Sequence, residues 1–254
     1  MSAPHRSAQA GVTPPTGMVG GSHDAGVGRR GAIISFEGID GAGKSTHLSA
    51  LAEAELMAAI GLPGVAAEGR FYPDTYLYSR GVSDLTVLRR AAALLSRRLA
   101  AVWAERAPDL PLQTPEQALV LASIVEKETG TAADRGQVAG VFINRLRLGM
   151  PLQTDPTVIY GISDAVGQPF GGNLRKRDLL TDTPWNTYTR RGLPPTPIAM
   201  PGMASLRAAV QPEPTQALYF VARGDGSSVF SSDLATHNRA VNQYQRGLTV
   251  TQKP

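Results

Sequence analysis

The chain has 254 residues, of which 42% are hydrophobic and 18% charged, and this balance is ordinary for a protein with a buried core. It has no cysteine, which excludes disulfides and thiolate metal sites, and its 4 histidines lack a ligand spacing, so we expect no metal site. The net charge of +4 neither requires nor excludes an anionic partner, and we expect no nucleic acid.

Both ends of the chain are predicted to lie outside the folded part. Residues 1–29 consist mainly of turn-forming and small residues, which predicts a disordered tail, and residues 247–254 form a second polar tail. No run reaches the ~18 apolar residues that a membrane-spanning helix needs. The N-terminal tail also lacks the apolar centre of a signal peptide. As written, the sequence therefore predicts neither an anchor nor an export signal.

A phosphate-binding motif follows the first tail. Residues 32–36 predict a short strand, a glycine-rich loop follows, and residues 48–57 predict a helix. In a loop of this kind the backbone N–H groups hold phosphates, the lysine reaches the outer phosphates and the serine holds Mg²⁺. The residues that match this pattern are Gly38, Gly43, Lys44 and Ser45.

Segment 36–46 resembles the start of bacterial thymidylate kinase, but the resemblance ends near Ala54. The arginine-rich lid and the later motifs of that family are absent. We therefore predict residues 30–55 to be a truncated strand–loop–helix fragment. A nucleotide-binding kinase, with ATP and Mg²⁺ as cofactors, is the alternative function if this fragment is functional.

Two segments precede the central helix. The aromatic residues of segment 68–76 fit either an edge strand or a platform for sugar rings. Residues 82–105 predict a long amphipathic helix, because leucines recur on one face and arginines on the other.

The next helix has clear boundary signals. Thr114 can cap its start, Pro115 suits the first helical position, and Gln117 completes a capping box. Gly130 supplies a stop signal. These signals predict a helix that ends close to two glutamates.

Glu126 is the candidate catalytic residue of this helix. At helical spacing it lies over Leu119, Ala122 and Ser123, a face of small and apolar groups. Such a face removes water from a carboxyl group and favours its neutral form, which a general acid needs near neutral pH. The alternative is that Glu126 and Glu128 only cover a helix end. Glu128 either assists Glu126 or faces solvent.

Shorter elements complete the chain. The sequence predicts a helix over 134–148, polar side chains ahead of an apolar strand within 152–161, a short helix over 204–210, a hairpin around the turn at 224–226, and a last helix that opens at His237.

Ordered motifs from Leu56 to Arg246 resemble the endolytic murein transglycosylase family, also called YceG-like. The motifs that carry the resemblance lie at 68–73, 124–129, 142–146, 152–161, 186–188, 192–195, 198–202, 218–222 and 237–238. The resemblance implies an α+β catalytic domain over residues 56–246, with mixed helices and short strands around the helix of Glu126.

The resemblance also implies a reaction. It is the cleavage of the β-1,4 bond between N-acetylmuramic acid and N-acetylglucosamine within peptidoglycan strands, with a 1,6-anhydro product. Glu126 is then the single general acid/base, and no cofactor is needed. The residues implied to bind the substrate are Gln153, Thr154, Asp155, Asn186 and Tyr188. For Asp155 and Asn186, local turn capping is an equal alternative.

Partners and location follow from the same resemblance. Peptidoglycan glycan strands are the expected partner, with the cell-wall synthesis machinery as a second one. The family implies the periplasmic face of the bacterial inner membrane. A catalytically inactive murein-binding module remains an alternative function. Trp185 and Tyr72 either stack on sugar rings or pack in the core.

Overall fold

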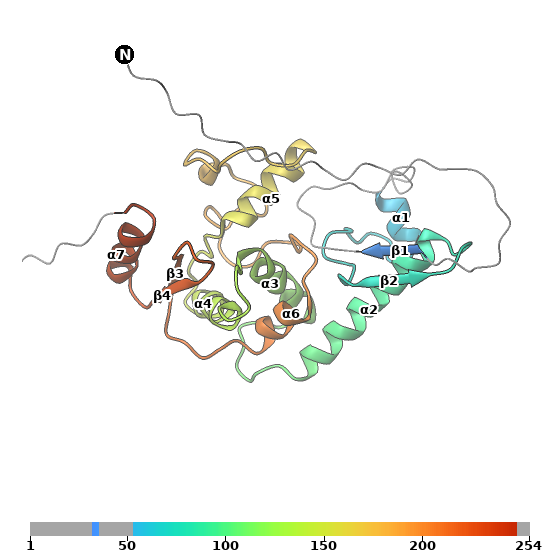
Figure 1. Ribbon diagram of the computed structural model, residues 1–254, viewed down its shortest axis with the longest axis horizontal. Helices are drawn as coiled ribbons and strands as arrows, with labels where there is room; N and C mark the ends of the chain where they lie inside the picture. Colours follow the sequence, from blue (N-terminus) through green and yellow to red (C-terminus); the bar gives the residue numbers. More distant parts are fainter. Residues whose placement is uncertain (1–31, 36–52, 248–254) are drawn as a thin grey trace, which may run out of the picture.

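The computed structural model of the protein describes residues 32–35 and 53–247 (Figure 1). The predicted phosphate-binding loop lies outside the described residues, as do the first tail and nearly all of the second. The described part combines seven α-helices with short antiparallel strands, so it belongs to the predicted α+β class.

Helix α3 (Pro115–Glu128) lies at the centre of the described fold. Residues 118–125 are all buried, so this helix is surrounded by other elements on every side. It packs against α2 (Asp84–Ala104), α4 (Arg135–Arg147), α5 (Asp155–Val166) and α6 (Met203–Val210). The last turn of α3 therefore projects from a rigid core.

The predicted start of α3 is confirmed. The Thr114 hydroxyl accepts a hydrogen bond from the Gln117 N–H at 3.2 Å, and the Gln117 side chain accepts one from the Gln113 N–H at 2.6 Å. At the other end the helix stops at Glu128, ahead of Thr129 in an extended conformation. Gly130 makes room for another segment, since a Cβ there would lie 2.9 Å from the Gly226 carbonyl oxygen.

Two small antiparallel sheets lie apart from each other. Strand β1 (Ala32–Ser35) pairs with β2 (Thr75–Tyr78), and β3 (Tyr219–Ala222) pairs with β4 (Ser228–Ser231). Helix α7 (Leu234–Tyr244) packs on the second pair. The predicted first strand and the predicted hairpin are thus confirmed. A phosphate-binding loop works beside parallel strands, and the described residues contain none.

A smaller apolar cluster joins α1 (Glu53–Ala59) to α2 and to residues 60–71. Arg70 fixes this cluster to α3 through two hydrogen bonds to Glu116, at 2.8 and 2.5 Å. Gly69, with φ +74°, lies against the loop that carries Pro197, where a Cβ would be 2.4 Å from the proline side chain. The segment 68–71 therefore locks the smaller cluster to the central helix and its loop.

The structure corrects two predicted elements. The segment predicted to lead into a strand is helix α5, because Pro156 suits a first helical turn and the buried side chains recur at helical spacing. Gly167, with φ +65°, ends that helix. Helix α7 begins at Leu234 and not at His237, since Asp233 caps it by accepting from the Thr236 N–H at 2.8 Å.

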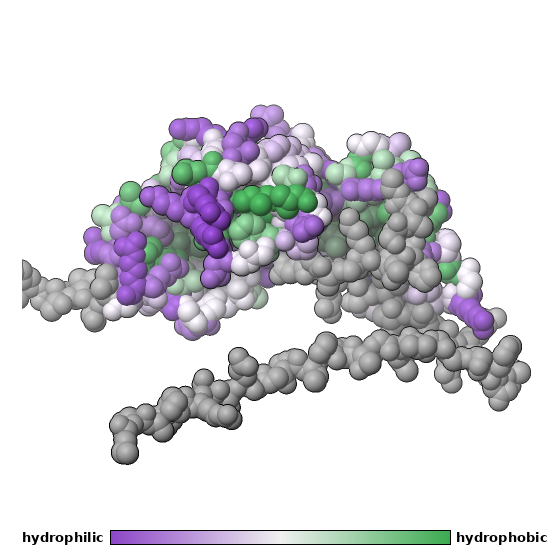
Figure 2. Space-filling model, turned by 90° about the horizontal axis from the view of Figure 1, so that it is seen from above, coloured by the Kyte–Doolittle hydropathy of each residue, from purple (hydrophilic) through white to green (hydrophobic). Residues whose placement is uncertain are grey.

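Apolar and polar side chains are mixed on the surface. Figure 2 shows one face, on which apolar patches alternate with hydrophilic side chains. Exposed apolar residues on or beside α5 include Ile159, Val166 and Leu180, the last in the short 3-10 helix η2 (Asp178–Leu180). No helix in the described ranges is long and apolar enough to cross a bilayer.

Candidate active site

The candidate site lies at the last turn of α3, where two glutamates point in different directions. Glu126 and Glu128 are two positions apart, which separates their side chains by about 200° around the helix. They consequently contact different elements: Glu126 is hydrogen-bonded to Gly202, and Glu128 to Thr154, one of the other predicted site residues.

Glu126 faces the loop that leads into α6. Its carboxylate accepts a hydrogen bond from the Gly202 N–H at 3.0 Å, at the start of that helix. A negative side chain is favourable at a helix N-terminus. One turn below, the Ser123 hydroxyl accepts from the Ile198 N–H at 3.0 Å. This face of α3 thus holds the 198–202 loop.

Glu128 faces α4 and α5 and is partly buried. The Thr154 hydroxyl donates a hydrogen bond to its carboxyl group. Burial raises the pKa of Glu128 to about 7, and the nearby Asp155 carboxylate adds to the rise, while the Thr154 hydrogen bond and the Arg145 guanidinium oppose it. The protonated form of Glu128 is therefore favoured more than that of an ordinary glutamate. Of the two alternatives for Glu128, exposure to solvent alone does not describe it, because its carboxyl group is hydrogen-bonded inside the fold.

Thr154 joins the start of α5 to the loop that follows η2. Its side chain is buried, and its N–H donates to the Thr187 hydroxyl at 3.1 Å. The Gln153 N–H donates to the Thr187 carbonyl at 3.1 Å, and the Thr157 and Thr187 hydroxyls lie 2.9 Å apart. These contacts bring two of the predicted motifs together beside Glu128.

Asp155, in the first turn of α5, also contacts the loop that carries Thr187 and Tyr188. The Tyr188 hydroxyl donates to the Asp155 carboxylate at 2.5 Å. Burial raises the pKa of Tyr188, and the hydrogen bond to Asp155 raises it further, so the phenol keeps its proton. Asp155 is exposed and Tyr188 half-buried, so both can be reached from solvent.

Asn186 is fully buried, and its amide is used inside the loop. The side-chain nitrogen donates to the carbonyls of Leu179 at 3.1 Å and Thr181 at 2.7 Å. Its oxygen accepts from the N–H groups of Tyr188 at 2.8 Å and Thr189 at 3.4 Å. This geometry matches the turn-capping alternative and leaves no polar atom of the side chain directed at a ligand.

Gln153 lies in an unusual conformation beside the two carboxylates. Its φ is +49°, in the left-handed region that residues other than glycine seldom adopt. Its N–H donates to the Thr187 carbonyl at 3.1 Å, which holds this conformation in place, and its side chain is exposed. Backbone strain of this kind is common at binding sites.

The two aromatic residues left open by the sequence both pack in the protein. The Trp185 ring nitrogen donates to the Thr196 hydroxyl at 2.9 Å, and its ring meets Tyr160 edge-on with centroids 5.3 Å apart. Tyr72 packs against the main core cluster. Packing therefore accounts for both side chains.

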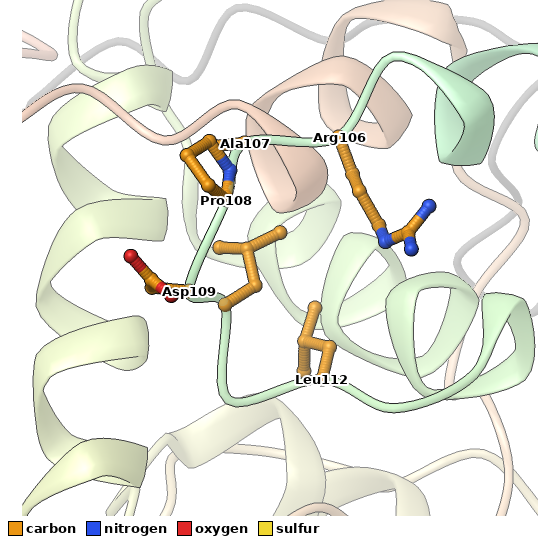
Figure 3. A pocket seen from close by; sticks show the side chains of 6 residues that line it. Arg106, Ala107, Pro108, Asp109 and Leu112 are labelled. Atoms are coloured by element: carbon orange, nitrogen blue, oxygen red, sulfur yellow. The ribbon is translucent and has the colours of Figure 1, made fainter.

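The described residues also form a cavity, and they contain no metal-binding group. A cavity of about 440 Å³ is lined by residues 106–110 and 112 at the α2–α3 connection, where Arg106 and Asp109 point to opposite sides (Figure 3). Within the described ranges, no group of three His, Cys, Asp or Glu side chains is arranged to hold a metal ion.

Sequence reasoning missed Arg145 on α4, which is buried and whose positive charge lowers the pKa of Glu128. Arg145 belongs to the 142–146 motif of the family resemblance, and this was the only sequence feature that could have drawn attention to it. Its role depends on contacts that the fold creates, so the spacing of residues could not reveal it.

A helix-borne carboxyl group, which accepts a hydrogen bond from the Thr154 hydroxyl at the start of α5, defines the candidate site as an acid/base centre. Comparison with known proteins supplies the family: residues 29–243 match the model of the YceG-like family, and the chain belongs to that family.

Similar proteins have been named for their activity. The chain is 38% identical over 177 residues to an endolytic murein transglycosylase of Bacillus subtilis, a match that covers 70% of this chain and 48% of the relative. It is 29% identical over 184 residues to one of Streptococcus pneumoniae, of which 32% is covered. The chain thus spans half or less of the length of these relatives.

A solved structure is also similar. The crystal structure of a YceG-like protein from Listeria monocytogenes matches with a TM-score of 0.58 and 35% identity, over 68% of this chain and 54% of that chain. This similarity supports the α+β fold described above.

Proposed function

We propose that the protein is a lytic transglycosylase that cleaves the β-1,4 bond between N-acetylmuramic acid and N-acetylglucosamine within peptidoglycan strands. Membership of the YceG-like family and the names of its relatives support the reaction. The observation that carries the proposal is the partly buried carboxyl group of Glu128, which accepts a hydrogen bond from the Thr154 hydroxyl and lies beside exposed polar side chains.

We further propose Glu128 as the general acid/base, in place of the sequence-based candidate Glu126. Burial holds the pKa of Glu128 at about 7, so a large share of the molecules carry the proton at neutral pH. Glu126, in contrast, accepts a hydrogen bond from the Gly202 N–H and holds the start of α6. The assignment of Glu126 stays a prediction, and comparison of the Glu126→Gln and Glu128→Gln variants distinguishes the two assignments.

A single carboxyl group suffices for this reaction. Glu128 gives its proton to the glycosidic oxygen while the bond from that oxygen to the anomeric carbon breaks. The carboxylate then takes the proton of the sugar's own 6-hydroxyl, whose oxygen bonds to the anomeric carbon and closes the 1,6-anhydro ring. Glu128 ends as it began, and no water is consumed. A second carboxyl group, which hydrolases use as a nucleophile or to activate water, has no task here.

The other predicted residues receive different roles. Thr154 is buried and orients Glu128 through its hydroxyl. Gln153 and Asp155 are exposed, and the Tyr188 phenol lies beside Asp155, so these three are our candidates for contacts with sugar hydroxyl and acetamide groups. Asn186 is assigned to holding the loop that carries Tyr188.

The setting of the reaction is part of the same proposal. Peptidoglycan strands are the partner, which implies a cell-envelope enzyme. The cell-wall synthesis machinery and the periplasmic face of the inner membrane remain predictions from the family resemblance. The kinase alternative rests on Lys44 and Ser45, which lie outside the described residues, and nothing in the described fold favours it.

The test is digestion of purified sacculi followed by mass spectrometry of the fragments. We expect 1,6-anhydro ends from the unaltered protein, none from Glu128→Gln, and reduced but measurable product from Glu126→Gln. Glu55→Gln is the matched control, since Glu55 is exposed on α1. Hydrolysed reducing ends would overturn the reaction, and activity that survives Glu128→Gln would overturn the residue. Binding to sacculi without product would indicate a murein-binding module.

A further inference from the structure

Three exposed apolar side chains lie on α5 and η2, two elements that pack against each other. Ile159 is 37% exposed, Val166 62% and Leu180 72%. Ile159 and Val166 are seven residues apart on α5, so they share one face of that helix. Single exposed apolar residues are normal, whereas a group of them marks an interaction site.

Three consecutive cations border these apolar side chains. Arg175, Lys176 and Arg177 are all exposed and come directly before η2. Figure 2 views the molecule from the side on which α5 lies in Figure 1, and it shows an apolar patch directly beside strongly hydrophilic side chains. We call the three apolar residues and the three cations together the α5–η2 surface.

Nearby carboxylates do not cancel the charge of this surface. Asp178 is engaged by its neighbours, since it accepts from the Arg175 N–H at 2.8 Å and lies 3.6 Å from the Arg177 guanidinium, which stays exposed. Asp164 is two positions before Val166, which places it about 200° away around α5. Among the residues that the structure describes, no carboxylate forms an ion pair with the side chain of Arg175 or Lys176.

Hydrogen bonds from inside the fold hold the surface in place. The Phe170 N–H donates to the Ser163 hydroxyl at 3.0 Å and fastens the connection between α5 and η2 to the helix. The buried Asn186 amide donates to the Leu179 carbonyl at 3.1 Å and fastens η2 from the other side. The exposure of Leu180 is therefore a property of the fold.

We infer that the α5–η2 surface is a docking site for an anionic phospholipid bilayer. Apolar side chains of such a surface enter the headgroup region, and the cations beside them bind lipid phosphates. A hydrated polyanion would pair with the cations but leave Val166 and Leu180 in water, so it fits the surface less well. The contact is peripheral, and it does not depend on which glutamate of α3 is the acid/base.

The docking site lies at one end of α5 and the candidate active site at the other. Asp155 and Val166 are the first and last residues of this helix, and the helical rise separates them by roughly 16 Å. Docking at Val166 thus keeps Asp155 within that distance of the contact at any tilt, and it leaves the start of α5 open. The active site would then face glycan strands that lie close to the bilayer.

Cosedimentation of the full chain with lipid vesicles tests the inference. We expect binding to vesicles of phosphatidylcholine mixed equally with phosphatidylglycerol, little binding to phosphatidylcholine alone, and weaker binding as salt is raised. The double variant Val166→Ser/Leu180→Ser should lower the partition coefficient about tenfold, because apolar area is lost. Arg175→Gln/Lys176→Gln should lower it about as much, because two cations are lost.

The chain offers a matched control for each double variant. Leu77→Ser/Leu148→Ser removes two leucines that are 71% and 63% exposed on other elements. Arg97→Gln/Arg98→Gln removes two consecutive exposed arginines from α2. Both controls should bind the mixed vesicles as the unaltered protein does.

A fluorescent label reports the depth of the contact directly. The chain has no cysteine, so Leu180→Cys gives one position for an environment-sensitive fluorophore. Its emission should shift to shorter wavelength on mixed vesicles, and the same label at Leu77→Cys should not shift.

The outcomes that overturn the inference are distinct from failure of the proposed function. Absence of binding to mixed vesicles, equal losses in the variants and their controls, or an unshifted label at position 180 overturns the docking site. Binding that inorganic polyphosphate abolishes and that Val166→Ser/Leu180→Ser leaves intact would indicate a polyanion site instead. Absence of anhydro product from sacculi overturns the reaction and leaves the vesicle result unaffected.

Discussion

The hydroxyl of Thr154, at the start of α5, donates a hydrogen bond to the carboxyl group of Glu128, at the end of α3. These residues are 26 positions apart, and their contact makes the orientation of the carboxyl group a property of the fold. Because Thr154 is itself buried and bonded to Thr187, the hydroxyl has little freedom to move. Thr154 thereby couples the loop of Tyr188 to the proposed acid/base, Glu128.

Thr154→Val tests this coupling while preserving the shape of the side chain. The variant loses the hydrogen bond that favours the charged form of Glu128, so the pKa of Glu128 should rise above about 7. We expect kcat on sacculi to fall about tenfold, since an unanchored carboxyl group is poorly aligned. The pH profile of kcat/KM, measured with 1,6-anhydro product, gives both effects.

The matched control is Thr86→Val, which alters a threonine in the first turn of α2, away from the site. Its rate and pH profile should equal those of the unaltered protein. A Thr154→Val enzyme with the original rate and the original profile would contradict the coupling.

The pH dependence of stability should also report Glu128. Its pKa rises from 4.5 to about 7 on folding, so the folded state binds the proton more tightly than the unfolded state. The stabilising contribution is complete below about pH 4.5 and is lost as the pH rises through about 7. A shift of this size corresponds to on the order of 3 kcal/mol.

Glu128→Gln removes this dependence, because glutamine does not titrate. In urea denaturation we expect the variant to be more stable than the unaltered protein at pH 8, by an amount that shrinks steadily toward pH 4.5. Glu55→Gln should show no such trend. A constant difference between Glu128→Gln and the unaltered protein across this range would show that Glu128 does not have a raised pKa.

Local signals predicted some elements well. The start of α3 was read correctly from Thr114, Pro115 and Gln117, because capping depends on neighbours in the sequence. The hairpin of β3 and β4 was predicted from its glycine turn. The α5 segment was predicted wrongly because its branched residues suggest a strand, whereas the proline in its first turn and the burial of one helical face favour a helix.

The candidate site was less accessible to sequence reasoning. The environment of Glu128 comes from Thr154, Asp155 and Arg145, all of which lie on or beside other helices. Sequence patterns predicted Glu126 in the last turn of this helix as the catalytic residue, but they could not tell which side of that turn would be enclosed. That choice depends on tertiary packing.

Substitution of Asn186 should lower the stability of the protein, because its side chain is used inside the loop and not for contact with sugar. In Asn186→Asp the side chain can no longer donate to the carbonyls of Leu179 and Thr181, and a charge is buried in their place. We expect a loss of about 3 kcal/mol in unfolding free energy, together with a fall in activity as the loop of Tyr188 loosens. Urea denaturation measures the loss.

Asn238→Asp is the control, since that asparagine is exposed on α7. It should change stability by less than about 0.5 kcal/mol. A stable Asn186→Asp protein with weakened sacculus binding would instead restore the sugar-contact role predicted from the sequence.

Gly69 and Gly64 offer a matched pair for testing how the segment before α2 is locked to the central helix. Both have φ +74°, so alanine carries the same left-handed backbone cost at each, about 1 kcal/mol. A Cβ at Gly64 meets nothing within 4 Å, whereas a Cβ at Gly69 would lie 2.4 Å from the Pro197 side chain and 3.2 Å from the Ala199 carbonyl oxygen.

We therefore expect Gly69→Ala to lower the unfolding free energy by about 2 kcal/mol more than Gly64→Ala, as overpacking requires. The clash should also displace the 197–202 loop, whose Gly202 N–H donates to Glu126. Urea denaturation of the two variants separates the loss of unfolding free energy caused by the steric clash from the loss caused by the left-handed backbone. Equal losses would mean that the loop yields to the added methyl group, and the segment would then not be locked to α3 through Pro197.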